Sequence, residues 1–328
     1  MRAAMPVAFH LPLRHRPDAS RQQAWQRGGP VPVEAEGKTA TAQAWIYQTW
    51  LHLSRAGADV ALVEELPREG VAVTLNGWLG TDFVAPRELF VAGVVADGLP
   101  HPGVDLQIVQ NLRHARRLPG AVFIPHWPQP GLVPRDPARG AKMEKVCFFG
   151  DPKNLAAGLR TPEWRRKLLE TTGAHFEQRS AESWHDYHDV DAVVAVRGFG
   201  RANQRHKPAT KLYNAWLAGV AFIGGKDSAY RAEATPGTDY LVAGSSDEVI
   251  DLVLKMRNSP QWRAKIVASG RNRSEAVGNR ELARRWSTLL EFMAQQRGNK
   301  LRKTKLRLAT ERRVKAALYK ADSLRRRD

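Results

Sequence analysis

The sequence is poor in cysteine, since Cys147 is the only one among 328 residues. A lone thiol cannot build an internal disulfide framework, which excludes the small disulfide-rich secreted class and favours a reducing compartment. Long apolar runs are also missing: no stretch approaches the about 18 apolar residues that suggest a membrane span. The opening MRAAMPVAFHLPL, broken by Pro6 and His10, makes a poor signal peptide. We expect a cytoplasmic protein.

Acidic residues are in deficit, with 33 Asp and Glu against 51 Lys and Arg and a net charge of +18. The excess is uneven. Residues 297–328 hold 13 Lys and Arg against 3 Asp and Glu, a net charge of +10, which leaves +8 for the other 296 residues. A mildly basic body with a strongly basic tail indicates an anionic partner: a phosphorylated substrate, a lipid surface or nucleic acid.

Apolar runs of strand length alternate with helical or loop segments along the chain. PVAFHLPL, DVALVEEL and GAVFIPHW are typical of buried strands, and 39–57 has helical spacing and ends at Gly57. Such an order indicates βαβ units on parallel sheets. The stretch 125–140, with five prolines and two glycines, interrupts the pattern, which then restarts.

We therefore expect an α/β fold of two Rossmann-like domains that face each other across a cleft, followed by a basic helical tail. The expected bounds are 1–133 for the first domain, 134–144 for a linker, 145–296 for the second domain and 297–328 for the tail. In open α/β sheets, ligands bind outside the carboxyl ends of the strands, so the cleft is the expected site.

The segment KPATKLYNAWLAGVAFIGG, residues 207–225, joins a helix start to a strand and a glycine pair. Lys207 and Lys211 flank the helix start, where cations oppose the helix dipole unless an anion is present. Arg197 ends the preceding predicted strand. Together with Thr210 these cations predict a diphosphate clamp. The alternative is that the lysines are ordinary solvated residues.

TKLYNAWLAGVAFIGG resembles the donor-site segment of GT-B glycosyltransferases, and KLYNAWLAGV is similar to the segment of fucosyltransferase-like and glycosyltransferase group 1 enzymes that binds the nucleotide diphosphate. The resemblance implies a hexosyltransferase with a nucleotide-sugar donor, and it puts Lys211 and Arg197 at diphosphate-binding positions. Retaining members carry a glutamate in an E-x7-E pattern, where this chain has Asn214 and, eight residues earlier, His206. Whether transfer is inverting or retaining stays open.

Other residues fall at positions that the resemblance assigns to the donor nucleotide or sugar. VCFFGDPKN is similar to the strand and glycine loop that open the donor domain, although a plain turn explains Lys153 equally well. Glu233 is as readily a packing or capping residue. The full set of these candidates is Gly150, Lys153, Tyr213, Asn214, Gly224, Gly225, Ser228 and Glu233.

The first domain is expected to supply the acceptor side. His10 lies near the carboxyl end of the first predicted strand and is the candidate general base, although a lone His at a strand end is more often structural. Asn76 and Asn111 also follow strands. No cofactor other than the donor is expected. No metal is expected either, because GT-B enzymes generally do without one and His185 and His188 fit a polar surface helix.

The basic tail is predicted to be helical, with an apolar face made by Val314, Ala317, Leu318, Ala321 and Leu324. Three interpretations remain open: a solvated helix, a peripheral anchor on an anionic membrane surface, or a nucleic-acid arm, which we favour least. The leading function is a glycosyltransferase acting on an unidentified hydroxyl acceptor, such as an envelope or lipid-linked glycan, at the inner face of the membrane. The alternatives are a non-catalytic nucleotide-sugar-binding scaffold and a polyanion-binding protein.

Overall fold

The apolar runs of the first half form one sheet of six parallel strands in the order β2-β1-β3-β4-β5-β6. The computed structural model describes residues 6–27, 37–201, 204 and 206–324. Every residue of β3 and β4 is buried, as expected for parallel strands covered on both faces. The strands are β1 (Val7–His10), β2 (Val60–Val63), β3 (Gly70–Leu75), β4 (Leu89–Val94), β5 (Leu106–Val109) and β6 (Ala121–Phe123).

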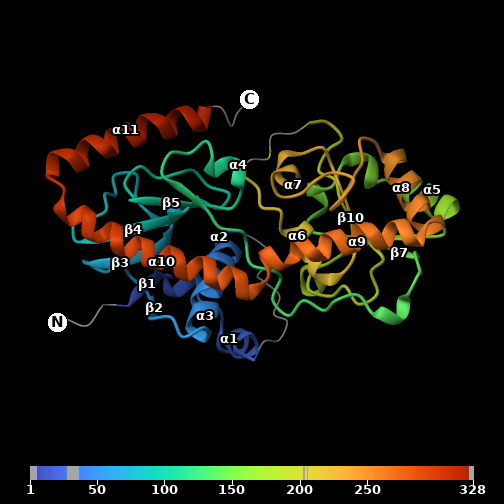
Figure 1. Ribbon diagram of the computed structural model, residues 1–328, viewed down its shortest axis with the longest axis horizontal. Coiled ribbons are helices and arrows are strands. Elements are labelled where there is room, and N and C mark those ends of the chain that lie inside the picture. The colour runs from blue at the N-terminus through green and yellow to red at the C-terminus, as the bar shows by residue number, and fades with distance from the viewer. Residues whose placement is uncertain (1–5, 28–36, 202–203, 205, 325–328) are drawn as a thin grey trace.

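The helices of the first half are α1 (Ala19–Gln26), α2 (Gly37–Ala42), α3 (Gln48–Arg55) and the short α4 (Leu112–Ala115), with a π-helical turn over Gln43–Tyr47 that joins α2 to α3. Among these helical segments (Figure 1), the stretch Gln43–Arg55 and α4 pack against the six-stranded sheet. The helix predicted over 39–57 is confirmed, and Gly57 follows its C-cap with φ 78°. Trp45, Ile46 and Leu53 from this stretch are buried in the core of the first domain.

The second half forms a separate sheet of five parallel strands in the order β11-β10-β9-β7-β8. Its strands are β7 (Lys145–Phe149), β8 (His175–Arg179), β9 (Ala192–Ala195), β10 (Ala221–Gly224) and β11 (Leu241–Val242). The helices of this half are α5 (Pro162–Thr172), α6 (Thr210–Ala218), α7 (Ser228–Glu233), α8 (Ser246–Asn258) and α9 (Pro260–Ser274).

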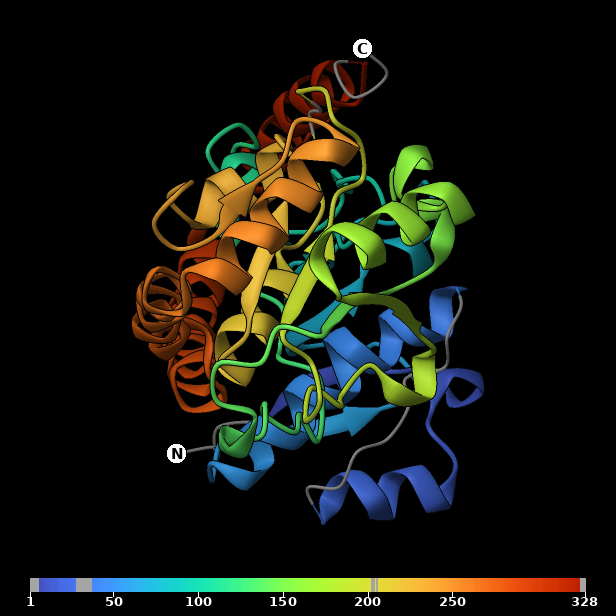
Figure 2. The same cartoon turned by 90° about the vertical axis from the view of Figure 1, so that its right-hand side faces the viewer.

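Alternate residues of these strands supply two cores. Helices lie on both faces of this sheet (Figure 2). In β7, Val146 and Phe148 pack with α5 and α8, whereas Cys147 and Phe149 pack with α6. This period of two is the ordinary consequence of strand geometry. The expected fold of two Rossmann-like domains is confirmed.

The chain crosses from the first domain to the second after Trp127, which is buried in the first core. Residues 133–136 already belong to the second domain, because Val133, Arg135 and Asp136 donate backbone hydrogen bonds to carbonyls of that domain. Arg135 and Arg139 both pair with the buried carboxylate of Asp191. The proline-rich stretch is therefore fixed to the second domain over much of its length.

The long helix α10 (Asn279–Arg302) carries the chain back to the first domain (Figure 1). Leu282, Trp286 and Met293 are fully buried in the first core, and α10 lies against α3, β3 and β4. The expected partition placed residues up to 296 in the second domain, and the structure differs here. The apolar face of α10 covers the first sheet, and so the chain crosses between the domains twice.

The basic tail forms α11 (Lys305–Leu324) and lies along the first domain. Tyr319 is buried with Val95, Val109 and Leu118, and Lys315 donates to the carbonyls of Val104 and Asp105. The predicted helix is thus present, and four residues of the predicted apolar face, Val314, Ala317, Leu318 and Ala321, are exposed. Within the described residues, no helix is long and apolar enough to cross a membrane.

Candidate functional site

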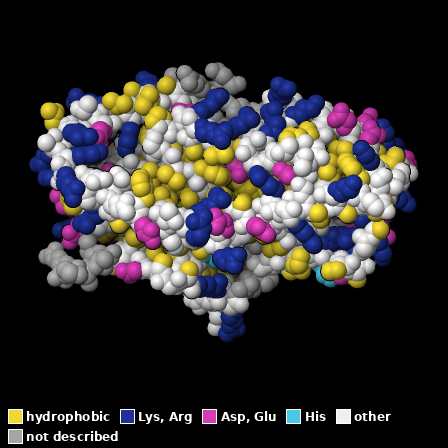
Figure 3. All heavy atoms as spheres, in the orientation of Figure 1, with side chains coloured by type: hydrophobic (Ala, Val, Ile, Leu, Met, Phe, Trp, Pro, Cys, Tyr) yellow, Lys and Arg dark blue, Asp and Glu magenta, His cyan; other side chains and the backbone are white. Residues whose placement is uncertain are grey.

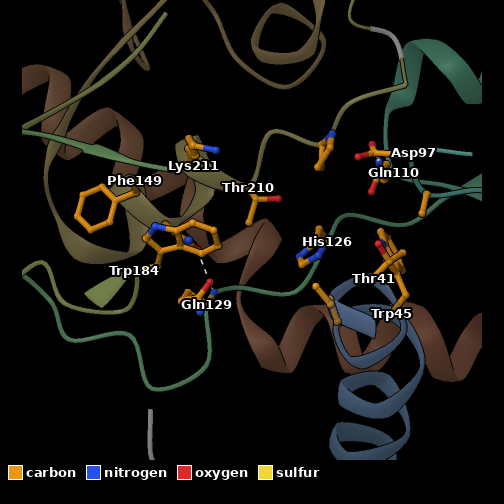
Figure 4. A pocket seen from close by; sticks show the side chains of 15 residues that line it. Thr41, Trp45, Asp97, Gln110, His126, Gln129, Phe149, Trp184, Thr210 and Lys211 are labelled. Atoms are coloured by element: carbon orange, nitrogen blue, oxygen red, sulfur yellow. Dashed lines mark hydrogen bonds between the residues drawn. The ribbon is translucent and has the colours of Figure 1, made fainter. Parts of the chain in front are cut away.

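A cavity of about 250 Å³ lies between the two domains, at the carboxyl ends of β4, β5, β6 and β7. Figure 4 shows side chains of both domains facing it from opposite sides. The first domain contributes Thr41, Trp45, Asp97, Gln110 and His126, and the second contributes Gln129, Phe149, Trp184, Thr210, Lys211 and Asn214. The site is where parallel sheets bind ligands.

Lys211, the second residue of α6, is the cation of this cavity. Burial, reinforced by the positive charges of Arg197 and Lys207, lowers the pKa of Lys211 to about 7. Its Nζ lies 5.8 Å from the centre of the Phe148 ring, and no carboxylate of the described residues forms an ion pair with it. A desolvated cation at a helix N-terminus is an unfavourable arrangement that a bound anion reverses.

Gly150 makes room for Lys211. Its φ is +155°, and a Cβ built there lies 3.0 Å from Lys211 Cε and 3.2 Å from Nζ. A side chain at this position would therefore push the Lys211 side chain or the Phe148 ring back by a few tenths of an ångström. The structure brings together these two residues, which the sequence analysis had assigned to separate segments of one site.

The other two cations of the predicted clamp are near Lys211 but already paired. Arg197 Nη1 lies 3.0 Å from Asp227 Oδ2, and its guanidinium covers the ring of Tyr230. Lys207 Nζ lies 2.9 Å from Asp97 Oδ2 of the first domain. Both raise the local positive potential, but Lys211 alone of the three lines the cavity.

Two further predicted residues, Thr210 and Asn214, line the cavity. Thr210 is the first residue of α6, after the N-cap Ala209. Asn214 is 5% exposed, and its Oδ1 accepts a hydrogen bond of 3.1 Å from the backbone N–H of Gln129. Tyr213, by contrast, is buried in the core behind α6 and does not line the cavity.

The remaining predicted donor residues lie outside the cavity lining. Lys153 is 75% exposed and pairs with Asp151. Glu233 is at the end of α7, and its carboxylate faces the buried Tyr213 and the backbone of α4, surroundings that raise its pKa through burial. Ser228 Oγ accepts from the backbone N–H of Gln204 at 2.8 Å.

The glycine pair after β10 is explained by packing. A Cβ on Gly224 lies 2.9 Å from the Tyr230 ring, and a Cβ on Gly225 lies 2.9 Å from the carbonyl of Gly198. Both positions need glycine for close approach of neighbouring segments, independently of any ligand. Neither glycine lines the cavity.

His10 also lies outside the cavity lining. It is 9% exposed, its Nδ1 is 2.7 Å from Thr74 Oγ1, and its ring contacts the edge of Trp78. Burial is the main cause that lowers the pKa of His10. The structure therefore gives His10 the surroundings of a packed core histidine.

His126, which the sequence analysis did not single out, lines the cavity instead. Its Nδ1 lies 2.7 Å from the carbonyl of Trp127, and because a carbonyl only accepts, Nδ1 carries the proton. Burial lowers the pKa of His126, so the ring is neutral and Nε2 keeps its lone pair. The signal was present, since His126 lies near the carboxyl end of the predicted strand GAVFIPHW, as His10 does in the first strand.

A second cavity of about 540 Å³ adjoins the first on the side of the first domain. The two share Ala40, Thr41, Ala96 and Asp97, and the second continues along Leu75, Trp78 and Val94. Ala96 has φ 46°, the single non-glycine residue with positive φ among those described. Backbone held in this conformation is typical of functional sites.

The domains meet through polar contacts around these cavities. Asn111 Nδ2 donates to the carbonyl of Lys207 at 2.9 Å, and Gln110 Nε2 donates to the carbonyl of His206 and to Asp97. Asn111 is also the N-cap of α4. The loop before α6 is thus held against the first domain by directional contacts. No group of described residues has the His, Cys, Asp and Glu set that holds a metal ion.

No protein-family model matches the chain, and no curated protein matches its sequence. Solved structures match its fold. Sucrose-phosphate synthase from Thermosynechococcus elongatus has a TM-score of 0.55 at 13% identity, with 88% of this chain and 99% of that chain covered. Anabaena HepE in complex with UDP and glucose has a TM-score of 0.52 at 10% identity, with 88% and 99% covered.

The pneumococcal O-GlcNAc transferase GtfA, in complex with UDP and GlcNAc, is a longer relative in fold: this chain spans 60% of its length, with 76% of this chain covered, a TM-score of 0.46 and 14% identity. HepE and sucrose-phosphate synthase, by contrast, match over nearly their whole length. The two parallel sheets with their helices agree with the matches to HepE and sucrose-phosphate synthase. The chain has the GT-B fold of the glycosyltransferases.

Proposed function

We propose that the protein is a glycosyltransferase that transfers a sugar from a nucleotide-sugar donor to a hydroxyl acceptor. The single observation that carries the proposal is Lys211, a desolvated lysine with a pKa of about 7 in the interdomain cavity of a GT-B fold. HepE, similar in fold, was solved in complex with UDP and glucose. A nucleoside diphosphate supplies the anion that such a lysine requires.

Lys211 and the N-terminus of α6 hold the diphosphate in this proposal. As the acceptor oxygen bonds to the anomeric carbon, the bond from that carbon to the diphosphate oxygen breaks, and its electron pair stays on the leaving diphosphate. Cations aimed at the developing charge stabilise the transition state more than the ground state. Arg197 acts at longer range, because Asp227 already neutralises it.

The first domain supplies the acceptor side. We assign the group that contacts the acceptor hydroxyl and takes up its proton to Nε2 of His126, which is unprotonated, in place of His10. The acceptor enters through the second cavity, where Trp78 and Val94 offer an apolar wall and Asp97 a carboxylate. The acceptor class is a hydroxyl of an envelope or lipid-linked glycan, made in the cytoplasm at the inner face of the membrane.

Calorimetric titration with UDP, GDP and ADP tests the donor site in wild type, Lys211→Ala and Arg197→Ala. The proposal expects micromolar-range binding of one nucleotide that weakens strongly in Lys211→Ala and less in Arg197→Ala. Sugar nucleotides carrying the preferred base then identify the sugar through release of the diphosphate. Equal affinity in all three proteins, or no binding of any nucleotide, contradicts the proposal.

A second candidate is a scaffold that binds a nucleotide-sugar without turnover. The observation in its favour is Asn214, which stands where retaining GT-B enzymes carry glutamate and which is held by the Gln129 backbone. This candidate predicts nucleotide binding that depends on Lys211 but no hydrolysis or transfer with any sugar nucleotide. The sugar-nucleotide panel separates the two functions.

A further inference from the structure

Helix α11 presents an apolar stripe to solvent. Leu306 is 78% exposed, Val314 53% and Leu318 42%, and Ala317 and Ala321 are exposed beside them. Figure 3 shows hydrophobic and basic side chains intermingled along the edge of the molecule where Figure 1 draws α11. Val314, Ala317, Leu318 and Ala321 are spaced three, four and seven residues apart and so form one continuous patch. Leu306, eleven residues before Ala317, lies on the same side of the helix, separated from the patch by Thr310.

The opposite face of α11 is fixed to the first domain. Tyr319 is 4% exposed and donates to the carbonyl of Pro119, Lys315 donates to the carbonyls of Val104 and Asp105, and Asp322 lies 3.5 Å from His114. These contacts set the rotation of the helix about its axis. The helix therefore cannot bury the stripe by rolling, and the stripe needs a partner from outside the described chain.

The charge around the stripe selects the partner. Residues 297–328 carry a net charge of +10, and Arg302, Lys305 and Arg313 are exposed on or next to α11. A second copy of this chain would bring two such tails together, which is unfavourable. A helix with an apolar stripe bordered by Lys and Arg matches the surface of an anionic bilayer, where acyl chains meet the stripe and headgroups meet the cations.

We propose that α11 binds the surface of an anionic lipid bilayer, lying parallel to it with Leu306, Val314 and Leu318 in the interface. The phosphates of a nucleic acid would pair with the cations but would leave the exposed leucines uncovered. In addition, α11 has no exposed aromatic residue on which a base could stack. The proposal is independent of the glycosyltransferase assignment, because it rests on the exposed face of one helix.

Vesicle co-sedimentation of the full chain tests the proposal. Vesicles that mix phosphatidylglycerol with phosphatidylcholine are compared with vesicles of phosphatidylcholine alone, at low and high salt. We expect binding to the mixed vesicles that weakens as salt rises and little binding to phosphatidylcholine. Truncation of the tail is the poorer test, because Lys300 is buried and donates to the carbonyls of Pro86 and Leu89.

Two sets of variants separate the apolar and charged contributions. Leu306→Gln combined with Leu318→Gln removes apolar contact without changing the charge, and we expect binding to fall by tenfold or more, roughly the worth of one partly buried leucine. Arg302→Gln and Arg313→Gln together remove two cations, each worth roughly fivefold near an anionic surface, so we expect a loss of roughly 25-fold. Leu13→Gln, at a position 63% exposed on the first domain, is the control and should bind as wild type.

Unchanged circular dichroism and melting temperature establish that the variants fold, which is expected because the substituted side chains are exposed. Several results would overturn the proposal: no binding to either vesicle, equal binding to both, or binding that the leucine substitutions leave intact. Retention of duplex RNA without vesicle binding assigns the tail to nucleic acid. Dimers that the leucine substitutions disperse assign the stripe to a second copy.

Discussion

Replacement of Lys211 by methionine separates a ligand-binding lysine from a structural one. Methionine keeps the length and apolar stem of the side chain and removes its charge. In the unliganded protein, burial and the charges of Arg197 and Lys207 hold the pKa of Lys211 at about 7, so about half of the molecules carry a neutral lysine at that pH. An unfolded lysine titrates near 10.4.

The stability change has a predictable sign. Between about pH 7 and 10 the unfolded chain binds one proton more than the folded chain, so the stability of wild type rises with pH over this window. The destabilisation by the charged lysine is complete below the folded pKa. We therefore expect Lys211→Met to melt at a higher temperature than wild type, with the largest difference below about pH 7 and a smaller one as the pH approaches 10.

Nucleotide affinity is expected to change in the opposite direction. A hydrogen bond to a charged group is worth about 1.5–3 kcal/mol, so Lys211→Met should bind UDP roughly 10- to 100-fold more weakly. In wild type, binding above pH 7 requires proton uptake by Lys211, because the diphosphate favours the ammonium form. UDP affinity should then fall by about tenfold per pH unit above 7, a range in which the phosphate is already ionised.

Calorimetry in buffers of different ionisation enthalpy measures the proton uptake, and scanning calorimetry measures the melting temperature. The matched control is Lys153→Met, which removes a lysine that is 75% exposed and paired with Asp151 and should change neither quantity. A variant that is less stable than wild type and binds UDP equally well would refute the reasoning. A pH-independent UDP affinity in wild type would do the same.

Three further predictions follow from contacts around the site and the tail. Gly150→Ala places a Cβ 3.0 Å from Lys211 Cε in left-handed backbone, so UDP binding measured by calorimetry should weaken; normal affinity would contradict the role of Gly150. His126→Gln should lower transfer by roughly 100-fold or more while the Kd for UDP stays unchanged, as a pH–rate profile and calorimetry report; full activity would remove His126 from the acceptor side. Lys300→Met leaves Asp105 without its ion-pair partner at 2.9 Å, and urea unfolding should show a loss of about 3–5 kcal/mol; a neutral result would contradict the account of how α10 is held.

The fold was predictable from the sequence because strand-length apolar runs and helical spacing alternate regularly, and the second sheet confirms that pattern in β7, β9 and β10. By contrast, the sequence did not predict that α10 returns to the first domain. Its sequence shows which face is apolar, but Trp286 and Met293 fit either sheet equally well by pattern. Only the position of the preceding helices in space decides which domain the helix covers.

The part of the candidate site around Lys211 was predictable, because the charge of this residue conflicts with the helix dipole. Lys211 at a helix start opposes the dipole, and this anomaly pointed to the cavity that the structure places around it. His126 was missed because several residues follow strands, and sequence alone does not say which strand ends face the cleft. The same limit explains His10, which is the last residue of β1 yet packs against Thr74 and Trp78.

The tail shows a third limit. Its apolar positions are visible in the sequence, but they do not say which side of the helix contacts the first domain. The structure docks α11 through Tyr319 and the lysine Lys315, whose long side chains reach backbone carbonyls. Polar anchoring of this kind depends on partners distant in sequence, so periodicity could not predict it.

A crystal structure of the protein with UDP tests directly whether Lys211 and the N-terminus of α6 hold the donor diphosphate. We expect the diphosphate in the cavity between the domains, within hydrogen-bonding distance of Lys211 Nζ and beside Gly150, with its negative charge at the N-terminus of α6. A diphosphate bound elsewhere, with Lys211 making no contact to it, would contradict the account.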